Sequence, residues 1–184
     1  MTLNVSMRGY KVFLASANKS LNNLKEESQL SDDNILYGTN IIVSCVACIE
    51  SLINHIFIHN TDFKWSDELR LKSKIDVFYY LNGDKVDWGG NPFQMFSTIV
   101  VVRNWLIHYK DEKLGLAGCE GQWITDKYNF PPKYDPFHIF KKETCEIYYN
   151  ATRQIVIALA KVAKLDESEY IFAETENYDY LINM

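Results

Sequence analysis

The stretch NPFQMFSTIVVVRNWLIHYK, residues 91–110, has the composition of a buried helix that a few polar residues interrupt. Asn91 is a preferred N-cap residue, and Pro92 suits the first helical position, where no backbone N–H is needed. The residues that follow are nearly all apolar or aromatic, apart from Arg103, Asn104 and His108. Burying such polar groups without partners is costly, so their presence in this helix needs a physical reason.

The three polar residues occupy different faces of the predicted helix. Asn104 and His108 are four positions apart and share one face, whereas Arg103 lies well round the cylinder, beside Phe96 and Ile99. The helix therefore presents two apolar surfaces with polar groups between them. We expect the core on one side and a second copy of the chain on the other, which makes the protein a homodimer.

The segment Arg103-Asn104-Trp105-Leu106-Ile107-His108 resembles the Arg-polar-x-x-x-His motif of HEPN domains, small all-helical modules of toxin–antitoxin and antiviral systems. Similarity to one HEPN branch extends to Pro92-Phe93-Gln94-x-Phe96, to His108-Tyr109-Lys110 and to Ala47-Cys48-Ile49-Glu50-x-Leu52-Ile53-Asn54, and covers roughly residues 10 to 165. The resemblance implies a metal-independent endoribonuclease that needs no cofactor. It also implies that two protomers bring their motifs together in one composite cleft.

The residue types in the motif suit RNA cleavage by attack of the 2′-hydroxyl group. That reaction needs a group with a pKa near neutrality to move protons, which suits His108, and a fixed cation beside the phosphorane, which suits the planar guanidinium of Arg103. Asn104 would orient His108 or the phosphate, and Tyr109 would support the site. Lys110 would bind a neighbouring phosphate of single-stranded or loop RNA.

A second set of candidate residues lies on the predicted helix 34–60. Glu50 and Asn54 are one helical turn apart. They are either a solvent-facing pair or supporting residues of the active site, in which case Glu50 would pair with Arg103 and hold it in place. Asn54 belongs to an arc of side chains without Lys or Arg, and Glu50 lies beside that arc. The residues of the arc are Asn40, Ser44, Ala47, Ser51, Asn54 and His55. A solvated face and the close approach of another helix both fit this arc. We expect the second, as an interface that lines the active site.

Composition and spacing exclude several other classes. The 184 residues carry a net charge of −5, which argues against a broad basic surface for nucleic acid. The apolar run Ile41–Ile58 is interrupted by polar residues, so we expect no membrane span, and a cytoplasmic protein without disulfides. His55 and His59 have metal-ligand spacing but lack a third ligand, and Cys45 and Cys48 are expected to be core residues, so no metal site is predicted.

We therefore predict one all-α domain over residues 1–184, an up-and-down bundle of about four main helices with an acidic aromatic tail at 166–184. The expected helices cover residues 10–27, 34–60, 68–81, 91–110 and 137–164, with a long loop over 111–136. The expected function is a homodimeric HEPN endoribonuclease of a defence or toxin–antitoxin system, neutralised by an antitoxin protein. The alternatives are a non-catalytic HEPN module that binds RNA, a nucleotide or a protein, and a purely structural dimerisation domain.

Overall fold

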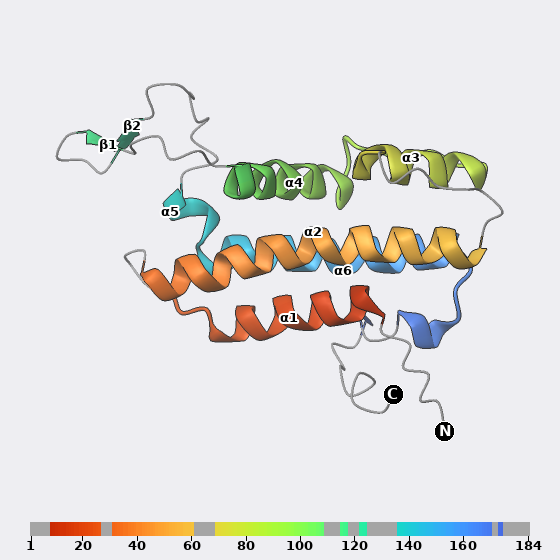
Figure 1. The fold of residues 1–184 in the computed structure, drawn as a ribbon, viewed down its shortest axis with the longest axis horizontal. Helices are drawn as coiled ribbons and strands as arrows, with labels where there is room; N and C mark the ends of the chain where they lie inside the picture. Colours follow the sequence, from red (N-terminus) through yellow and green to blue (C-terminus); the bar gives the residue numbers. More distant parts are fainter. Residues whose placement is uncertain are drawn as a thin grey trace.

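A computed structural model describes residues 8–26, 31–60, 69–108, 115–117, 122–124, 136–170 and 173–174. The long helices are α1 (Gly9–Asn23), α2 (Asp32–Asn60), α4 (Phe93–His108) and α6 (Lys142–Val162). They lie side by side and alternate in direction along the chain (Figure 1). The prediction of an all-α up-and-down bundle is confirmed.

The helix α2 is the centre of the bundle. It packs against α1 on one side, against α4 on the other, and against α6 behind it (Figure 1). Its core residues are each at most 1 % exposed: Ile41, Ile42, Cys45, Val46, Cys48, Ile49, Leu52, Ile53 and Ile56. By length and composition alone α2 could cross a membrane, but 61 % of its apolar window is buried inside the bundle. The central helix of a bundle needs the same composition.

The short helix α3 (Leu71–Leu81) lies end to end with α4 in one layer above α2 (Figure 1). The loop between them is held by Trp88, whose Nε1–H donates to the Asp76 carboxylate at 2.6 Å. The Trp88 ring packs edge-on against Phe93 with a centroid separation of 5.5 Å, and Phe93 also meets the Tyr79 ring at 5.8 Å. These aromatic contacts fix the first turn of α4 against the end of α3.

The beginning of α4 lies slightly later than the sequence predicted. The first helical residue is Phe93, and the carbonyl of Pro92 accepts the hydrogen bond of the Phe96 amide at 3.1 Å. Pro92 therefore directly precedes the helix, and an earlier acceptor is the carbonyl of Gly90, which accepts from the Gln94 amide at 2.9 Å. Asn91, the cap expected from the sequence, is not the residue next to the helix. A difference of one or two residues at a helix end is ordinary, and it leaves the faces of α4 unchanged.

The predicted single helix over 137–164 is wrong, because it is divided into α5 (Pro136–Ile139) and α6. Lys141 adopts an extended conformation (φ −64°, ψ 142°) and separates the two. The break directs Phe140 onto α2 at Gly38, where an added Cβ would lie 2.6 Å from the Phe140 ring. A glycine is therefore required at position 38 for this close approach.

The predicted loop over 111–136 contains a short hairpin in the described parts of that segment. Its strands are β1 (Gly115–Ala117) and β2 (Gln122–Ile124), which pair antiparallel with Leu116 opposite Trp123. Two strands of three residues each are too small to alter the fold class.

The polar arc on α2 is covered by α1 of the same chain. Asn40 donates to the hydroxyl oxygens of Ser16 at 3.2 Å and Ser20 at 2.5 Å. The Cys48 thiol donates to the carbonyl of Tyr10 at 3.2 Å. The expectation of a close helix contact is confirmed at Asn40, which α1 of the same chain covers. The role of the arc in an active site stays a prediction.

The described part of the tail folds back onto the bundle. The short 3₁₀ helix η2 (Glu167–Glu169) brings the Glu169 carboxylate to the guanidinium of Arg8 and to the Tyr10 hydroxyl, which donates to it at 2.5 Å. Further along, the Arg153 guanidinium donates to the carbonyl of Ala173 at 2.6 Å. Residues 175–184 lie outside the described part of the chain.

Candidate active site on α4 and a cavity between α1 and α2

Arg103 is held on the inner side of α4 by the residues that flank it. Ile99 and Phe96, one and two turns earlier on the same side, are fully buried, which turns Arg103 partly inward and leaves it half-buried. Among the described residues, no hydrogen bond or ion pair reaches its guanidinium. A half-buried cation without a partner loses hydration and gains nothing in return, so the position is costly unless a ligand binds there.

Asn104 lies on the opposite, outer side of α4, where it is exposed. Val101, an apolar residue of this outer side, is also 51 % exposed. Ile107 is 54 % exposed, but it lies one turn after Arg103 and on the Arg103 side of the helix. His108 is the last residue of α4, and helical spacing puts its backbone on the same side as Asn104, one turn further on. Of the two apolar surfaces expected for this helix, the one packed in the core is present. The uncovered outer side combines Val101 with polar residues in the described structure, and its role as a contact with a second copy stays a prediction.

Three predicted positions cannot be followed to their side chains. The side chain of His108 and the whole of Tyr109 and Lys110 lie outside the described residues. The roles proposed for them from the sequence stay predictions.

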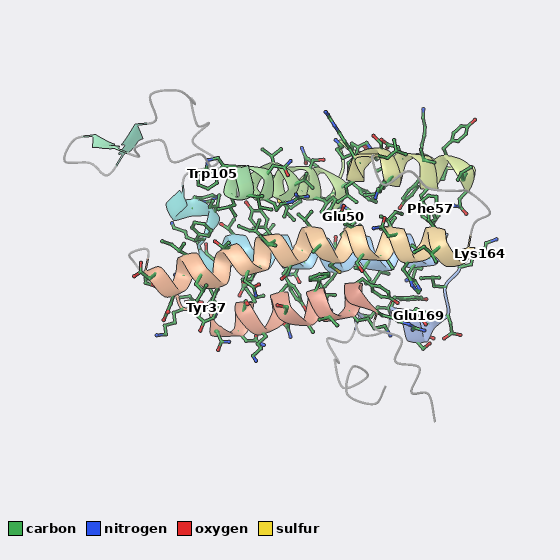
Figure 2. All side chains as sticks on the ribbon, viewed as in Figure 1. Tyr37, Glu50, Phe57, Trp105, Lys164 and Glu169 are labelled. Atoms are coloured by element: carbon green, nitrogen blue, oxygen red, sulfur yellow. The ribbon has the colours of Figure 1, made fainter. Side chains whose placement is uncertain are left out.

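Glu50 and Asn54 do not meet Arg103 in the described structure. Figure 2 shows Glu50 near the middle of α2, while Trp105, two residues after Arg103, lies near the far end of α4. No ion pair joins Glu50 to Arg103 among the residues described. The supporting role expected for Glu50 stays a prediction, and the ion pair that it was based on is absent from the described chain.

Asn54 has a partner that the sequence did not suggest. The amino group of Lys74 on α3 donates to the Asn54 Oδ1 atom at 3.1 Å, and Lys74 is only 3 % exposed. In the sequence, Lys74 alternates with other charged and apolar residues of a short amphipathic helix, so nothing distinguished it from a surface lysine. Its burial depends on how α3 packs on α2, which helical periodicity does not specify.

Glu50 and Asn54 instead line a cavity of about 530 Å³ between the beginning of α1 and the second half of α2. Arg8 and Phe13 of α1 form one wall, and Ser51 of α2 lies at its base, against Gly9. The volume lies within the range of roughly 300–1,000 Å³ that is usual for small-molecule sites. The sequence indicated half of this site through the polar arc, but not the half that α1 supplies.

The wall formed by α1 is fixed by the buried Tyr10. Burial and the hydrogen bond to Glu169 raise the pKa of the Tyr10 phenol far above its usual value, so this hydroxyl stays a proton donor. The ring of His55, another residue of the cavity, lies 5.4 Å from the Tyr10 ring. The Glu169 carboxylate also pairs with Arg8, and this Glu169 cluster (Glu169, Arg8 and Tyr10) holds the beginning of α1 in place.

The cysteines in the described chain are core residues, as predicted. Cys45, Cys48 and Cys145 are fully buried, and burial raises the pKa of the Cys45 and Cys145 thiols to about 12. Such thiols are protonated at neutral pH and poor as nucleophiles or ligands. Within the described residues, no group of three or more His, Cys, Asp or Glu side chains could hold a metal ion.

Comparisons with protein-family models, with curated proteins and with solved structures found no match for this chain. The resemblance to HEPN domains therefore depends on the motif of α4 and on the residues around it. The helical bundle is compatible with that resemblance but is too common an architecture to carry it.

Proposed function

We propose that this chain is a metal-independent endoribonuclease of the HEPN type, in which Arg103, Asn104 and His108 carry the reaction. The observation that supports it most is Arg103, a half-buried guanidinium with no partner among the described residues, on the helix that ends at His108. A phosphate would supply the missing partner, because the guanidinium fork binds two phosphate oxygens at once.

The reaction has a simple atom balance. The 2′-oxygen attacks the phosphorus, the bond from phosphorus to the 5′-oxygen breaks, and the products are a 2′,3′-cyclic phosphate and a free 5′-hydroxyl group. His108 takes the proton of the 2′-hydroxyl in one protomer, and the second copy of His108 supplies a proton to the leaving oxygen. Arg103 stabilises the charge of the phosphorane, and Asn104 orients the imidazole or the phosphate.

The outer side of α4 supports a homodimer. Val101 exposes about half of its surface there, and the short residues Asn104 and Ser97 beside it allow a second helix to approach. An isologous contact along this side would bring the two His108 positions toward one cleft. Sedimentation at micromolar concentration should show a dimer, and a purely monomeric species would contradict the proposal.

The activity is tested by incubating the protein with a mixed pool of RNA, with and without a chelator. We expect cleavage that the chelator does not affect and that produces 2′,3′-cyclic phosphate ends. Arg103→Ala should lose activity, whereas Arg70→Ala, at an exposed arginine before α3, should not. Cleavage that stops with the chelator, or that survives Arg103→Ala, would show that a different site or a contaminating nuclease is responsible.

We also propose a cytoplasmic toxin or defence setting, in which a partner protein neutralises the nuclease. Expression in a bacterial host should then slow growth, and His108→Ala should relieve the effect. Equal growth with both chains would contradict a toxic role without contradicting the nuclease itself.

The second candidate is a non-catalytic HEPN module that binds RNA, a nucleotide or a protein. The cavity beside Glu50 favours it, because a built pocket away from α4 serves binding rather than cleavage. Intact RNA in the assay above, together with saturable binding of RNA or nucleotide, would favour this function over the nuclease.

A further inference from the structure

The cavity between α1 and α2 carries a carboxylate and an amide that point to a specific kind of ligand. Glu50 lines the cavity, is half-buried, and forms no hydrogen bond or ion pair with any described residue. It therefore offers acceptors that are partly withdrawn from water. A ligand with N–H donors would satisfy them.

The orientation of Asn54 is fixed by its neighbour. Its Oδ1 atom accepts from Lys74 at 3.1 Å, so the Nδ2 group is the part of the amide that is left to donate. Glu50 and Asn54 are one helical turn apart, which puts their Cβ atoms about 5–6 Å from one another. Their side chains can therefore reach neighbouring atoms of one small ring, with an acceptor beside a donor.

The mouth of the cavity is apolar and includes an aromatic ring. Phe13 is 38 % exposed and Ile58 is 75 % exposed, and both line the cavity. A flat heterocycle could stack on the Phe13 ring while its polar edge faces Glu50 and Asn54.

The local charges disfavour a cationic ligand. The Lys74 amino group lies directly behind Asn54, and the Arg8 guanidinium in the cavity wall is paired with Glu169. The positive and negative charges around Glu50 therefore nearly cancel, and the cavity is not strongly acidic. A neutral ring with an amino group suits this arrangement better than a polyamine does.

We infer that this cavity is a nucleobase-binding pocket. Glu50 accepts from the exocyclic amino group of cytosine or adenine, Asn54 donates to the adjacent ring nitrogen, and the base stacks on Phe13. Uracil also fits, because its N3–H can donate to Glu50 while the adjacent O4 atom accepts from Asn54, so the pocket recognises a base edge with a donor beside an acceptor. The pocket does not depend on cleavage at α4, although in a nuclease it would bind one base of the substrate.

The test is binding of mononucleotides to the full chain, measured by calorimetry and by saturation-transfer NMR. CMP, UMP and AMP should each bind saturably at micromolar to millimolar concentration. Ribose 5-phosphate, which lacks a base, should not bind. No saturable nucleotide binding, or equal binding of ribose 5-phosphate, would overturn the proposal, the second outcome indicating an anion site at Arg8.

Two variants assign the binding to the proposed residues. Glu50→Gln should weaken CMP binding about 10-fold, because the base amino group then donates to a neutral acceptor instead of a carboxylate. Phe13→Leu, which keeps an apolar side chain but removes the ring, should weaken binding about 5-fold or more. Glu143→Gln, at an exposed carboxylate of α6, serves as the matched control.

The binding experiment gives a clear result even if one of the two variants does not fold. If Glu50→Gln fails to fold, Phe13→Leu and the comparison of CMP with ribose 5-phosphate in the wild type still decide. Unchanged CMP affinity in a folded Glu50→Gln or Phe13→Leu protein would overturn the assignment. Because the readout is direct binding, an inactive nuclease leaves this result unaffected, and loss of nucleotide binding leaves the cleavage proposal standing.

Discussion

The end of α4 and the cavity between α1 and α2 are built in opposite ways. The residues proposed for cleavage, Arg103 to His108, are contiguous in the sequence and lie on one helix at the edge of the bundle. The cavity combines residues from the two ends of the α1–α2 hairpin, and its amide is oriented by Lys74 of a third helix. A contiguous motif can be found from the sequence alone, whereas a site assembled by packing becomes visible only in three dimensions.

The largest expected effect separates the two regions completely. His108→Ala should lower RNA cleavage by about 10²–10⁴-fold, since it removes the group that moves the protons. Nucleotide binding at the cavity should be unchanged. The measurements are initial cleavage rates and CMP affinity, with His138→Ala at an exposed histidine of α5 as control. A variant that unfolds or loses its dimer would instead make His108 a structural residue.

A kinetic comparison of Arg103 with Glu50 sharpens the distinction. Arg103→Ala should lower kcat by about 10²–10³-fold, because it removes a cation that acts on the transition state. Glu50→Gln should mainly raise KM, because a base contact contributes equally to substrate and transition state. Steady-state rates on a short single-stranded RNA give both constants. A fall in kcat for Glu50→Gln would restore the role first expected for it, that of positioning Arg103.

The Glu169 cluster should affect the cavity and not α4. Glu169→Gln removes the charge that pairs with Arg8 and weakens the acceptor of the Tyr10 hydroxyl, so it should cost about 1–3 kcal/mol of unfolding free energy. Urea denaturation measures this cost, with Glu167→Gln in the same 3₁₀ helix as control. CMP affinity should fall more than the cleavage rate does. Equal stability of the two variants would mean that the tail adds nothing to the wall of the cavity.

The smallest expected effect is a change in how strongly RNA affinity depends on salt concentration. With a net charge of −5 the whole chain does not attract RNA, so binding should depend on a few cations near α4. Lys110→Ala should lower the slope of log affinity against log salt by about 0.7, the value for one phosphate of a single strand. A steep slope that this substitution leaves unchanged would place the basic surface elsewhere, for example on Lys141 and Lys142.

Periodicity was enough for the fold and for the faces of its helices. It put Phe96 and Ile99 on a different face of α4 from Asn104, and the structure shows that the face with Phe96 and Ile99 is the buried one. On α2 it outlined the arc of short side chains, which a solvated face and a contact with another helix both fitted. It could not say which helix covers that arc, because Asn40 and Ser44 would suit α1 and a second protomer equally well. That is why the arc was assigned to the active site, and why Glu50 was paired with Arg103.

Other features had no sequence signal of their own. The break before α6 falls at Phe140 and Lys141, where no glycine or proline interrupts the helical pattern. Its cause is the packing of Phe140 onto Gly38, a contact between segments about a hundred positions apart. The burial of Lys74 likewise follows from tertiary packing rather than from local preference.

The contact between Arg8 and Glu169 joins residues 161 positions apart in the chain. During synthesis α1 and α2 leave the ribosome early, and they can pair as a local hairpin while the rest of the protein is still being made. Glu169 is synthesised only after α6 is complete, so the wall of the cavity is fixed late, followed by the contact of Arg153 with Ala173. A nascent chain would therefore acquire its hydrophobic core before it could hold a ligand, and a chain that stops before residue 166 would retain the bundle with that wall unsupported.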